Sequence, residues 1–285
     1  MNDSTAPTPD VPVDACRRWH HGAGSWRHPD EQPDVQLAHT TFNPVDYQIR
    51  DIPEVDAKHF VLTHHYAASW PAVSHRFGLI HTPTDQLVGV AAYGIPVQAK
   101  VLTAAYPTLT PYTQSIELSR LVLLDAVPAN AESWFIARCH RALKERGVRG
   151  VVSFADPQPR YDRSGALIKP GHFGIVYQAL NAHYAGRGTA RTLTMLPDGT
   201  VLNDRSRSKI LNTERGAQHV IAKLTSLGAP EWTPNQDPRN WLNEALAAIG
   251  AQKIKHPGNH RYLFPLAKKL ELGMHVTSNY PKPGN

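Results

Sequence analysis

Two strongly apolar stretches each carry a charged side chain that could do chemistry. Arg120 follows Ser119 inside SIELSRLVLL (115–124), and Asp156 ends VRGVVSFADP (148–157). An unpaired buried guanidinium is costly, so Arg120 on a central strand must be paired or line a cleft. Carboxylates that end strands in open α/β sheets commonly face the ligand crevice, although an Asp before proline also caps turns. On neighbouring strands, the two side chains predict a polar site at one sheet edge.

A helix start follows the first of these strands. The loop DAVPAN leads into AESWFIARCHRALKERG (131–147), with Asn130 expected at the N-cap and Gly147 just past the end. Free N–H groups at a helix start bind phosphate well. The loop lacks the glycine-rich cradle of a P-loop or dinucleotide fold, so an ordinary strand-to-helix turn is the alternative.

Tyrosine and histidine side chains offer proton-transfer groups. A helix predicted over 174–186 places Tyr177, Asn181 and Tyr184 on one face. A phenol can serve as a general acid or hydrogen-bond within the core, and the spacing alone favours a packed tyrosine. His64 and His65 lie in a segment expected as a strand or short helix. On a strand, these two adjacent side chains would point to opposite faces and could not easily share one metal ion. No HExxH motif accompanies them. No metal site is therefore predicted, and a proton acceptor near the cleft is the functional alternative.

Basic residues gather in two places late in the chain. Arg205, Arg207 and Lys209 recur at period two in DRSRSKIL (204–211), a spacing that would place three cations on one face toward a phosphate backbone. A second cluster comprises Lys253, Lys255, His256, His260 and Arg261. Either group could be an ordinary solvated surface.

Composition sets the compartment and the class of partner. Lys and Arg number 30 against 24 Asp and Glu, giving a formal charge of +6 that fits nucleic acid, a phosphorylated cofactor or simply a soluble surface. Two cysteines, Cys16 and Cys139, form no disulfide framework or CxxC pair. No apolar run reaches the ~18 residues of a membrane span, and the N-terminus has no signal-like apolar region. A cytoplasmic protein without a membrane partner is expected.

Strands and helices must position these groups. Strands at 76–81 and 86–96 form a predicted hairpin, and 190–203 forms another; strands 115–124 and 148–157 alternate with helices, and strand 260–266 comes last. This order predicts one α/β domain with a mixed central sheet, right-handed crossovers and an antiparallel flank. The expected boundaries are a disordered or loosely docked tail at 1–35, a domain at 36–270 with an insertion at 158–170 and an extra region at 212–259, and a flexible tail at 271–285.

The chain resembles the Mom family of phage DNA-modification proteins in five ordered motifs: ELSRLVLLD, NAESWF, GVVSFADP, GHFGIVYQALN and HRYLF. HHYAASWP and FGL…LVGVAAYG resemble that family's first part. The similarity covers about residues 58–190 and the strand 260–266. It implies a GNAT-like fold and the conversion of adenine in DNA to a carbamoylmethylated (acetamido) adenine at N6, which shields phage DNA from restriction.

The resemblance also implies the site residues. Asp156 would recognise the base or accept its proton, Arg120 would hold donor or phosphate charge, and Tyr177 would act on the leaving side. His65 matches the histidine of the early motif, and Ser133 would bind the cofactor near the helix start. Beside these five matched residues, Asn130 and Ser119 are predicted to contact the cofactor from their positions at the helix start and on the strand before it. Double-stranded DNA is the expected partner, contacted by Arg205, Arg207 and Lys209. A homodimer is one alternative for the oligomeric state.

The sequence departs from typical GNAT enzymes at the cofactor loop. DAVPANAES stands where Q/R-x-x-G-x-G/A would hold the pyrophosphate of acetyl-CoA. The predicted donor is therefore either acetyl-CoA or another acyl or glycyl donor. Iron is implied by the family resemblance alone. Two rival functions remain: a GNAT acyltransferase acting with acyl-CoA on a small-molecule or protein amine, and a non-catalytic DNA-binding protein on a GNAT scaffold. If a phage or prophage encodes the chain, the host cytoplasm is the expected compartment.

Overall fold

The computed structural model describes residues 41–67, 69–124, 127–169 and 171–282. The predicted tail at 1–35 and loop residue Asp125 lie outside these residues. The chain divides into two compact units. The first contains the described residues up to Asp156, together with His172–Arg187 and the chain from His260 onward. The second contains Pro157–Gly171 and Gly188–Asn259, so the chain passes between the units four times.

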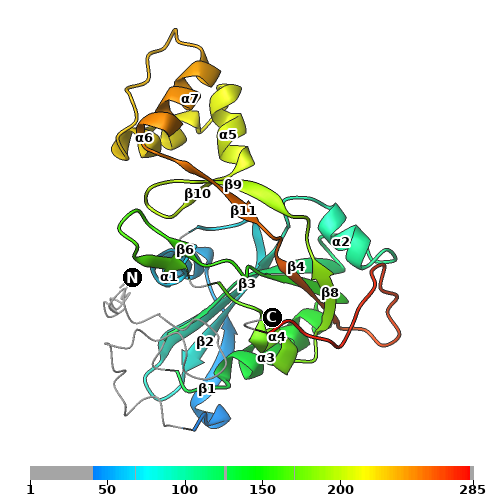
Figure 1. Cartoon of the computed structure of the whole chain (residues 1–285). Coiled ribbons are helices and arrows are strands. Elements are labelled where there is room, and N and C mark those ends of the chain that lie inside the picture. Colours follow the sequence, from blue (N-terminus) through cyan, green and yellow to red (C-terminus); the bar gives the residue numbers. More distant parts are fainter. Residues whose placement is uncertain (1–40, 68, 125–126, 170, 283–285) are drawn as a thin grey trace. The chain divides into compact units, whose positions relative to one another are not determined.

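A seven-stranded mixed sheet forms the centre of the first unit (Figure 1). Its order is β1 (Tyr47–Asp51), β2 (Val73–His81), β3 (Gln86–Gly94), β4 (Ser115–Leu123), β5 (Gly150–Ala155), β12 (His260–Pro265) and β8 (His183–Arg187). All neighbours are antiparallel except β4 and β5, which run parallel around the crossover helix. The predicted α/β fold, with a mixed central sheet flanked by helices, is confirmed, as are the first hairpin and the central position of strand 115–124.

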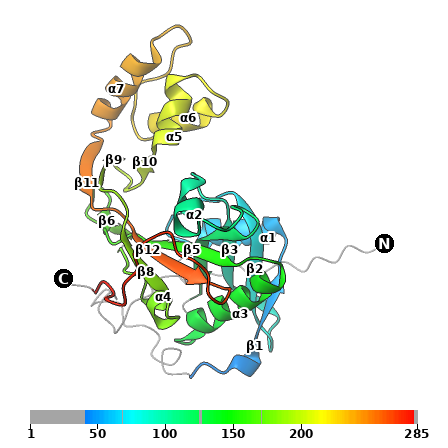
Figure 2. The ribbon, with the colours of Figure 1, turned by 90° about the vertical axis from the view of Figure 1, so that its right-hand side faces the viewer.

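Helices cover both faces of this sheet. α3 (Ala131–Glu145) and α4 (Ile175–Ala179) lie on one face, and α1 (Glu54–His64) and α2 (Lys100–Ala105) lie on the other (Figure 2). Successive strand residues point to opposite faces, so Val151 packs in the main core with Phe135 of α3, whereas Val152 packs with Tyr106 beyond α2. Burial on both sides explains why β4 and β5 are almost continuously apolar.

The predicted helix over 174–186 is wrong in its second half. Only Ile175–Ala179 is helical, and His183–Arg187 forms the edge strand β8. Asn181 adopts a left-handed backbone (φ 55°), which ends the helix. Tyr184 then pairs with Tyr262 of β12. Tyr177, Asn181 and Tyr184 therefore do not share a helix face.

The helix predicted over 131–147 is confirmed as α3. Gly147 follows it with φ 91°, the left-handed conformation common just past a helix end. Asn130 stands at the N-cap position, but its backbone is left-handed (φ 73°) and its side chain makes no capping bond. The expected asparagine cap is therefore absent.

The second unit has its own sheet and core. β9 (Arg191–Met195) lies between β10 (Val201–Leu202) and β11 (Gln252–His256), which confirms the second predicted hairpin, and β6 (Arg160–Tyr161) pairs with β7 (Leu167–Lys169). Three helices, α5 (Asp204–Leu211), α6 (Ala217–Ser226) and α7 (Pro238–Ala248), bury a separate apolar cluster that includes Ile210, Leu224 and Trp241. The predicted domain at 36–270 thus spans two compact units, and both 158–170 and 212–259 fall in the second.

Residues 271–282 pack against the rest of the first unit. Tyr280 donates its hydroxyl hydrogen to the Ala182 carbonyl at 2.8 Å, and the Thr277 amide donates to the Tyr184 carbonyl at 2.9 Å. Met274 and Val276 pack beside Leu263. This stretch, expected as part of a flexible tail, is therefore held along β8 and β12. No helix among the described residues is long and apolar enough to cross a membrane.

Candidate functional site

The parallel strands β4 and β5 part in the middle of the sheet. They pair only from Ser115–Gly150 to Leu118–Ser153, although β4 continues to Leu123 and β5 to Ala155. Beyond this point β4 stays paired with β3, and β5 stays paired with β12. The divergence opens the sheet at the C-terminal ends of two parallel strands, the usual ligand-binding edge of an α/β sheet.

A β-bulge lies at the same point. Leu118 pairs with Tyr93 and Arg120 with Ala92, so Ser119 is the extra residue on β4. Glu117 pairs with Gly94, and Gly94 and Ala92 are two residues apart on β3. The bulge therefore places Glu117 and Arg120 on one face of β4, the face that carries α1, although they are three positions apart in the sequence.

Arg120 is held in place by several hydrogen bonds. Its Nε donates to the Ser69 carbonyl at 3.1 Å, Nη2 donates to Ser69 Oγ at 2.8 Å, and Nη1 donates to the Ser119 carbonyl at 2.6 Å. Burial lowers its pKa, while Tyr66 and Glu117 nearby raise it. We expect a guanidinium at this position to be paired or to line a cleft. It is paired, because Ser69, in the segment that follows α1, accepts two of its hydrogen bonds.

Glu117 is a candidate that sequence reasoning missed. Burial raises its pKa to about 7, and the Arg120 charge and a hydrogen bond with Ser119 only partly oppose this shift. A carboxyl group with a pKa near neutrality can accept a proton at physiological pH. In the sequence, Glu117 is simply a polar residue in an alternating strand. Nothing in the residue pattern of 115–124 predicts the bulge at Ser119.

Contacts link Asp156 to the loop after α1. The His172 amide donates to the Asp156 carbonyl at 2.8 Å, and the His172 ring lies 6.3 Å from the Tyr66 ring. Tyr66 stacks on His65 at 4.2 Å and interacts electrostatically with Arg120. Tyr66 and His172 therefore link Arg120, His65 and the backbone of Asp156 near the point where β4 and β5 part.

His65 comes directly after the helix α1. Of the two predicted alternatives for this segment, a strand or a short helix, the structure shows the helix. The Ala67 amide donates to its Nδ1 at 3.0 Å, so the neutral imidazole carries its proton on Nε2. His64 ends the helix, and burial lowers its pKa.

Tyr177 lies under the divergence, in the core. It is 6% exposed, its hydroxyl hydrogen-bonds Ser153, and its ring packs 5.3 Å from that of Tyr262. Ser153 donates in turn to the Leu118 carbonyl at 3.5 Å, at the last strand pair before β4 and β5 part. Burial raises the Tyr177 pKa, so its phenol keeps its proton.

The expected cofactor-binding residues lie on two elements. Ser119 is the bulged residue, and its hydroxyl donates to the Glu117 carbonyl at 3.4 Å. Ser133 donates to the Asn130 carbonyl at 3.1 Å in the first turn of α3. Both Asn130 and Ser133 belong to the start of the helix that follows β4.

The three expected DNA-contacting cations lie in the second unit, and their predicted arrangement is wrong. Arg205, Arg207 and Lys209 belong to the helix α5, where residues two apart point nearly opposite ways. Arg205 and Lys209 are close to one face, whereas Arg207 points away from it. Arg205 also pairs with Glu214 at 2.6 Å.

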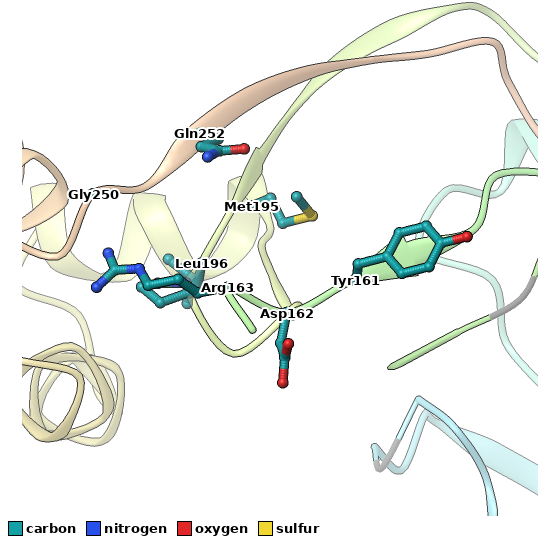
Figure 3. A pocket seen from close by; sticks show the side chains of 8 residues that line it. Tyr161, Asp162, Arg163, Met195, Leu196, Gly250 and Gln252 are labelled. Carbon is teal, nitrogen blue, oxygen red and sulfur yellow. The ribbon is translucent and has the colours of Figure 1, made fainter. Parts of the chain in front are cut away.

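The second unit also contains a hollow of about 160 Å³ lined by Tyr161, Arg163, Met195 and Gln252 (Figure 3). Asp162 borders it but is committed to a turn, accepting from the Ser164 and Ala166 amides. The Arg163 guanidinium donates to the Ile249 carbonyl. The hollow is smaller than the ~300 Å³ typical of ligand pockets, and its two charged side chains, Asp162 and Arg163, are already bonded. Among the described residues, no group of three or more His, Cys, Asp or Glu side chains could hold a metal ion, so the structure gives iron no support.

A model of the Mom protein family matches residues 46–282. The sequence has no significant match among curated proteins. Similar solved structures include an N-acetyltransferase from Staphylococcus aureus Mu50 (12% identity, TM-score 0.34, 78% of this chain and 99% of that one). Others are a tandem GNAT protein from the clavulanic acid biosynthesis pathway (9%, 0.40, 79% and 100%) and yncA, a putative acetyltransferase from Salmonella typhimurium with its cofactor acetyl-CoA (10%, 0.36, 78% and 95%). At these TM-scores the similarity carries no argument about function.

Proposed function

The chain belongs to the Mom protein family, and on that premise we propose that it is a transferase that converts adenine in DNA to an N6-carbamoylmethyl (acetamido) adenine. One observation carries the proposal. Arg120 and Glu117, Asp156, and His65 come from three different parts of the sequence, and the contacts of Tyr66 and His172 near the parting of β4 and β5 support their joint use in one site. Modification of phage DNA in this way would protect it from restriction.

The reaction needs a proton acceptor close to the adenine amino group. Adenine N6 is a poor nucleophile because its lone pair is delocalised into the ring. In the proposed step N6 bonds to the methylene carbon of a donor of the form X–CH2–CO–NH2, the bond from that carbon to the leaving group X breaks with its electron pair on X, and the N6 proton passes to a carboxylate. Asp156 and Glu117 are two carboxylates among the described residues near this edge, and the raised pKa of Glu117, about 7, suits it to accept a proton.

The other residues bind and orient. Arg120 would hold a phosphate or carboxylate of the donor, because its fork of donors is fixed by Ser69. Ser119, Asn130, Ser133 and the start of α3 would contact the donor's phosphate groups. Tyr177 would act on the leaving side, since its protonated phenol lies under the divergence. His65 and Tyr66 offer stacked rings against which a base extruded from a duplex could rest.

The donor determines which bond forms. Acetyl-CoA, or a glycyl donor activated at its carboxyl group, would deliver an acyl group through its carbonyl carbon. The carbamoylmethyl group instead needs a donor whose leaving group is on the methylene carbon. The diverging strands and the helix start could accommodate a phosphorylated donor of either kind, although the loop between them has no glycine-rich sequence. No step of the proposal passes through iron.

Charge supports DNA as the substrate. The second unit carries 12 Lys and Arg against 7 Asp and Glu, whereas the rest of the chain carries 18 against 17. Nearly all of the net charge of +6 therefore belongs to the smaller unit. Duplex DNA is bound chiefly through neutralisation of its phosphates by such side chains.

Mass analysis of nucleosides from DNA of cells expressing the chain tests the proposal, with Asp156→Asn beside it. We expect a new deoxyadenosine species in the wild type whose added mass identifies the transferred group, and its loss in the variant. Unchanged nucleosides from abundant, folded protein would instead favour transfer to a small-molecule or protein amine, or DNA binding without catalysis.

A further inference from the structure

His260 is a buried histidine at the edge of the candidate site. It begins β12, pairs with Ala155 at the end of β5, and so stands beside Asp156. Its side chain is 1% exposed. Nδ1 lies 2.8 Å from the Tyr184 hydroxyl, while Nε2 has no hydrogen-bond partner in the part of the chain that the structure describes. An unsatisfied buried polar group is destabilising, so its retention calls for a reason.

The Nδ1 contact allows a tautomer that would suit a ligand. Burial raises the pKa of Tyr184, so its phenol stays protonated and can donate to Nδ1. In that arrangement the ring proton stands on Nε2. Burial, reinforced by Arg187, lowers the His260 pKa to about 4 despite the opposing charge of Asp156, so the ring is neutral at pH 7. In this tautomer, on which the inference below depends, His260 presents a neutral N–H donor that no described residue accepts from, next to Asp156, whose carboxylate can only accept.

We infer that His260 and Asp156 form a donor–acceptor pair that recognises the target adenine. This inference rests on the proposed function. The Asp156 carboxylate would accept a hydrogen from N6, and His260 Nε2 would donate to the neighbouring ring nitrogen, N1 or N7. Bidentate recognition of adenine by asparagine or glutamine uses the same pairing of one acceptor with one donor. Guanine has an oxygen in place of the amino group and would face the carboxylate with a second acceptor.

A further observation favours a base at this place. The ring of Phe173 lies 5.5 Å from that of His260, which adds an aromatic surface beside the pair.

Base analogues test the pair atom by atom. The probe is an oligonucleotide with one central residue opposite an abasic site, which lowers the cost of extrusion. That residue is adenine, 1-deazaadenine, 7-deazaadenine or purine, and Kd is measured without any donor. We expect wild-type protein to bind one deaza analogue, and purine, about tenfold more weakly than adenine, the usual order for the removal of one hydrogen bond.

Variants then assign the hydrogen bond to His260. His260→Phe should lower affinity for adenine about tenfold and abolish discrimination against the deaza analogue, while discrimination against purine persists. His260→Gln, which keeps an N–H donor, should restore part of the discrimination. His140→Phe is the matched control: His140 is also buried in the first unit with an unpartnered Nε2, but it contacts the rings of Tyr93 and Phe264. Thermal unfolding of each variant establishes that it is folded.

The outcomes separate this inference from the proposed function. Wild-type protein that binds adenine and both deaza analogues equally would overturn the inference, as would discrimination that survives His260→Phe. Discrimination that depends on His260, in a protein that leaves cellular DNA unmodified, would support the pair and refute the proposed reaction. Modified DNA without His260-dependent discrimination would do the reverse.

Discussion

At the residue scale, Glu117 couples the chemistry of the site to the stability of the fold. Its pKa is raised by burial to about 7, from an ordinary 4.5. The folded protein therefore binds more protons than the unfolded chain between these values, and stability falls as the pH rises through this window. The loss is at most about 3 kcal/mol, because each pKa unit corresponds to about 1.4 kcal/mol.

Glu117→Gln should remove this dependence. We expect the variant to gain stability over the wild type on going from pH 5 to pH 8, measured by urea unfolding at both values, and to lose most DNA modification because its amide cannot accept the proton. Glu145→Gln, at an exposed position on α3, is the control and should show neither effect. An equal pH dependence in wild type and Glu117→Gln would show that Glu117 is solvated.

Arg120 tests whether fixed geometry or charge alone is needed. Lysine keeps the charge but cannot make the directed bonds to both oxygens of Ser69. Arg120→Lys should therefore reduce modification by tenfold or more, while the free energy of unfolding changes by only about 1 kcal/mol. Nucleoside mass analysis and urea denaturation measure the two. Full activity in the lysine variant would mean that a positive charge suffices.

Arg120 and Asp156 could be predicted from sequence because each is a charged residue at a fixed place in an apolar strand. Neighbouring parallel strands then had to bring them to one edge. Glu117 and His260 could not be found this way. Glu117 reaches the site through the bulge at Ser119, and His260 through an antiparallel pairing that joins residues more than 100 positions apart.

At the element scale, local pattern and tertiary pairing compete in residues 174–187. The sequence has helical periodicity there, yet Asn181 is left-handed and the chain turns into β8 to pair with β12. A pairing with a strand so much later in the chain cannot be seen in local periodicity. The basic run at 204–211 is a different case, because Asn203 caps the helix α5 through the Ser206 amide, a signal that is local in sequence. The helix replaces the predicted period-two spacing of the cations.

Asn181 should therefore be the sensitive position in this turn. Its φ of 55° is tolerated by asparagine and glycine but disfavoured for other residues. Asn181→Ala should lose about 1 kcal/mol of unfolding free energy, while Asn181→Gly should be close to neutral. Urea denaturation compares the two variants. Equal losses would show that the asparagine side chain, and not the backbone conformation, matters.

At the scale of the whole molecule, charge is unevenly divided between the units. The second unit is assembled from two separate segments, residues 157–171 and 188–259. Its excess of Lys and Arg over Asp and Glu is therefore not visible as one basic stretch of sequence, and the overall net charge of +6 is modest. Within that unit, Lys253 and Lys255 are exposed and lie two residues apart on the edge strand β11. They pair with Thr194 and Thr192, so both lysines lie on one face of the sheet.

Neutralising this face should weaken duplex binding and flatten its salt dependence. Each DNA phosphate that the protein no longer neutralises reduces the steepness of log K against log salt by about 0.9, so Lys253→Gln with Lys255→Gln should reduce it by about 2 if both lysines bind phosphates. Lys268→Gln with Lys269→Gln removes the same charge from the first unit and is the matched control. Fluorescence anisotropy of a labelled duplex over a salt series measures both. If only the Lys253 and Lys255 substitutions change the slope of log K against log salt, the second unit binds the phosphate backbone. Equal changes from both pairs would mean that net charge alone governs affinity. The duplex would then need no particular unit for its attachment.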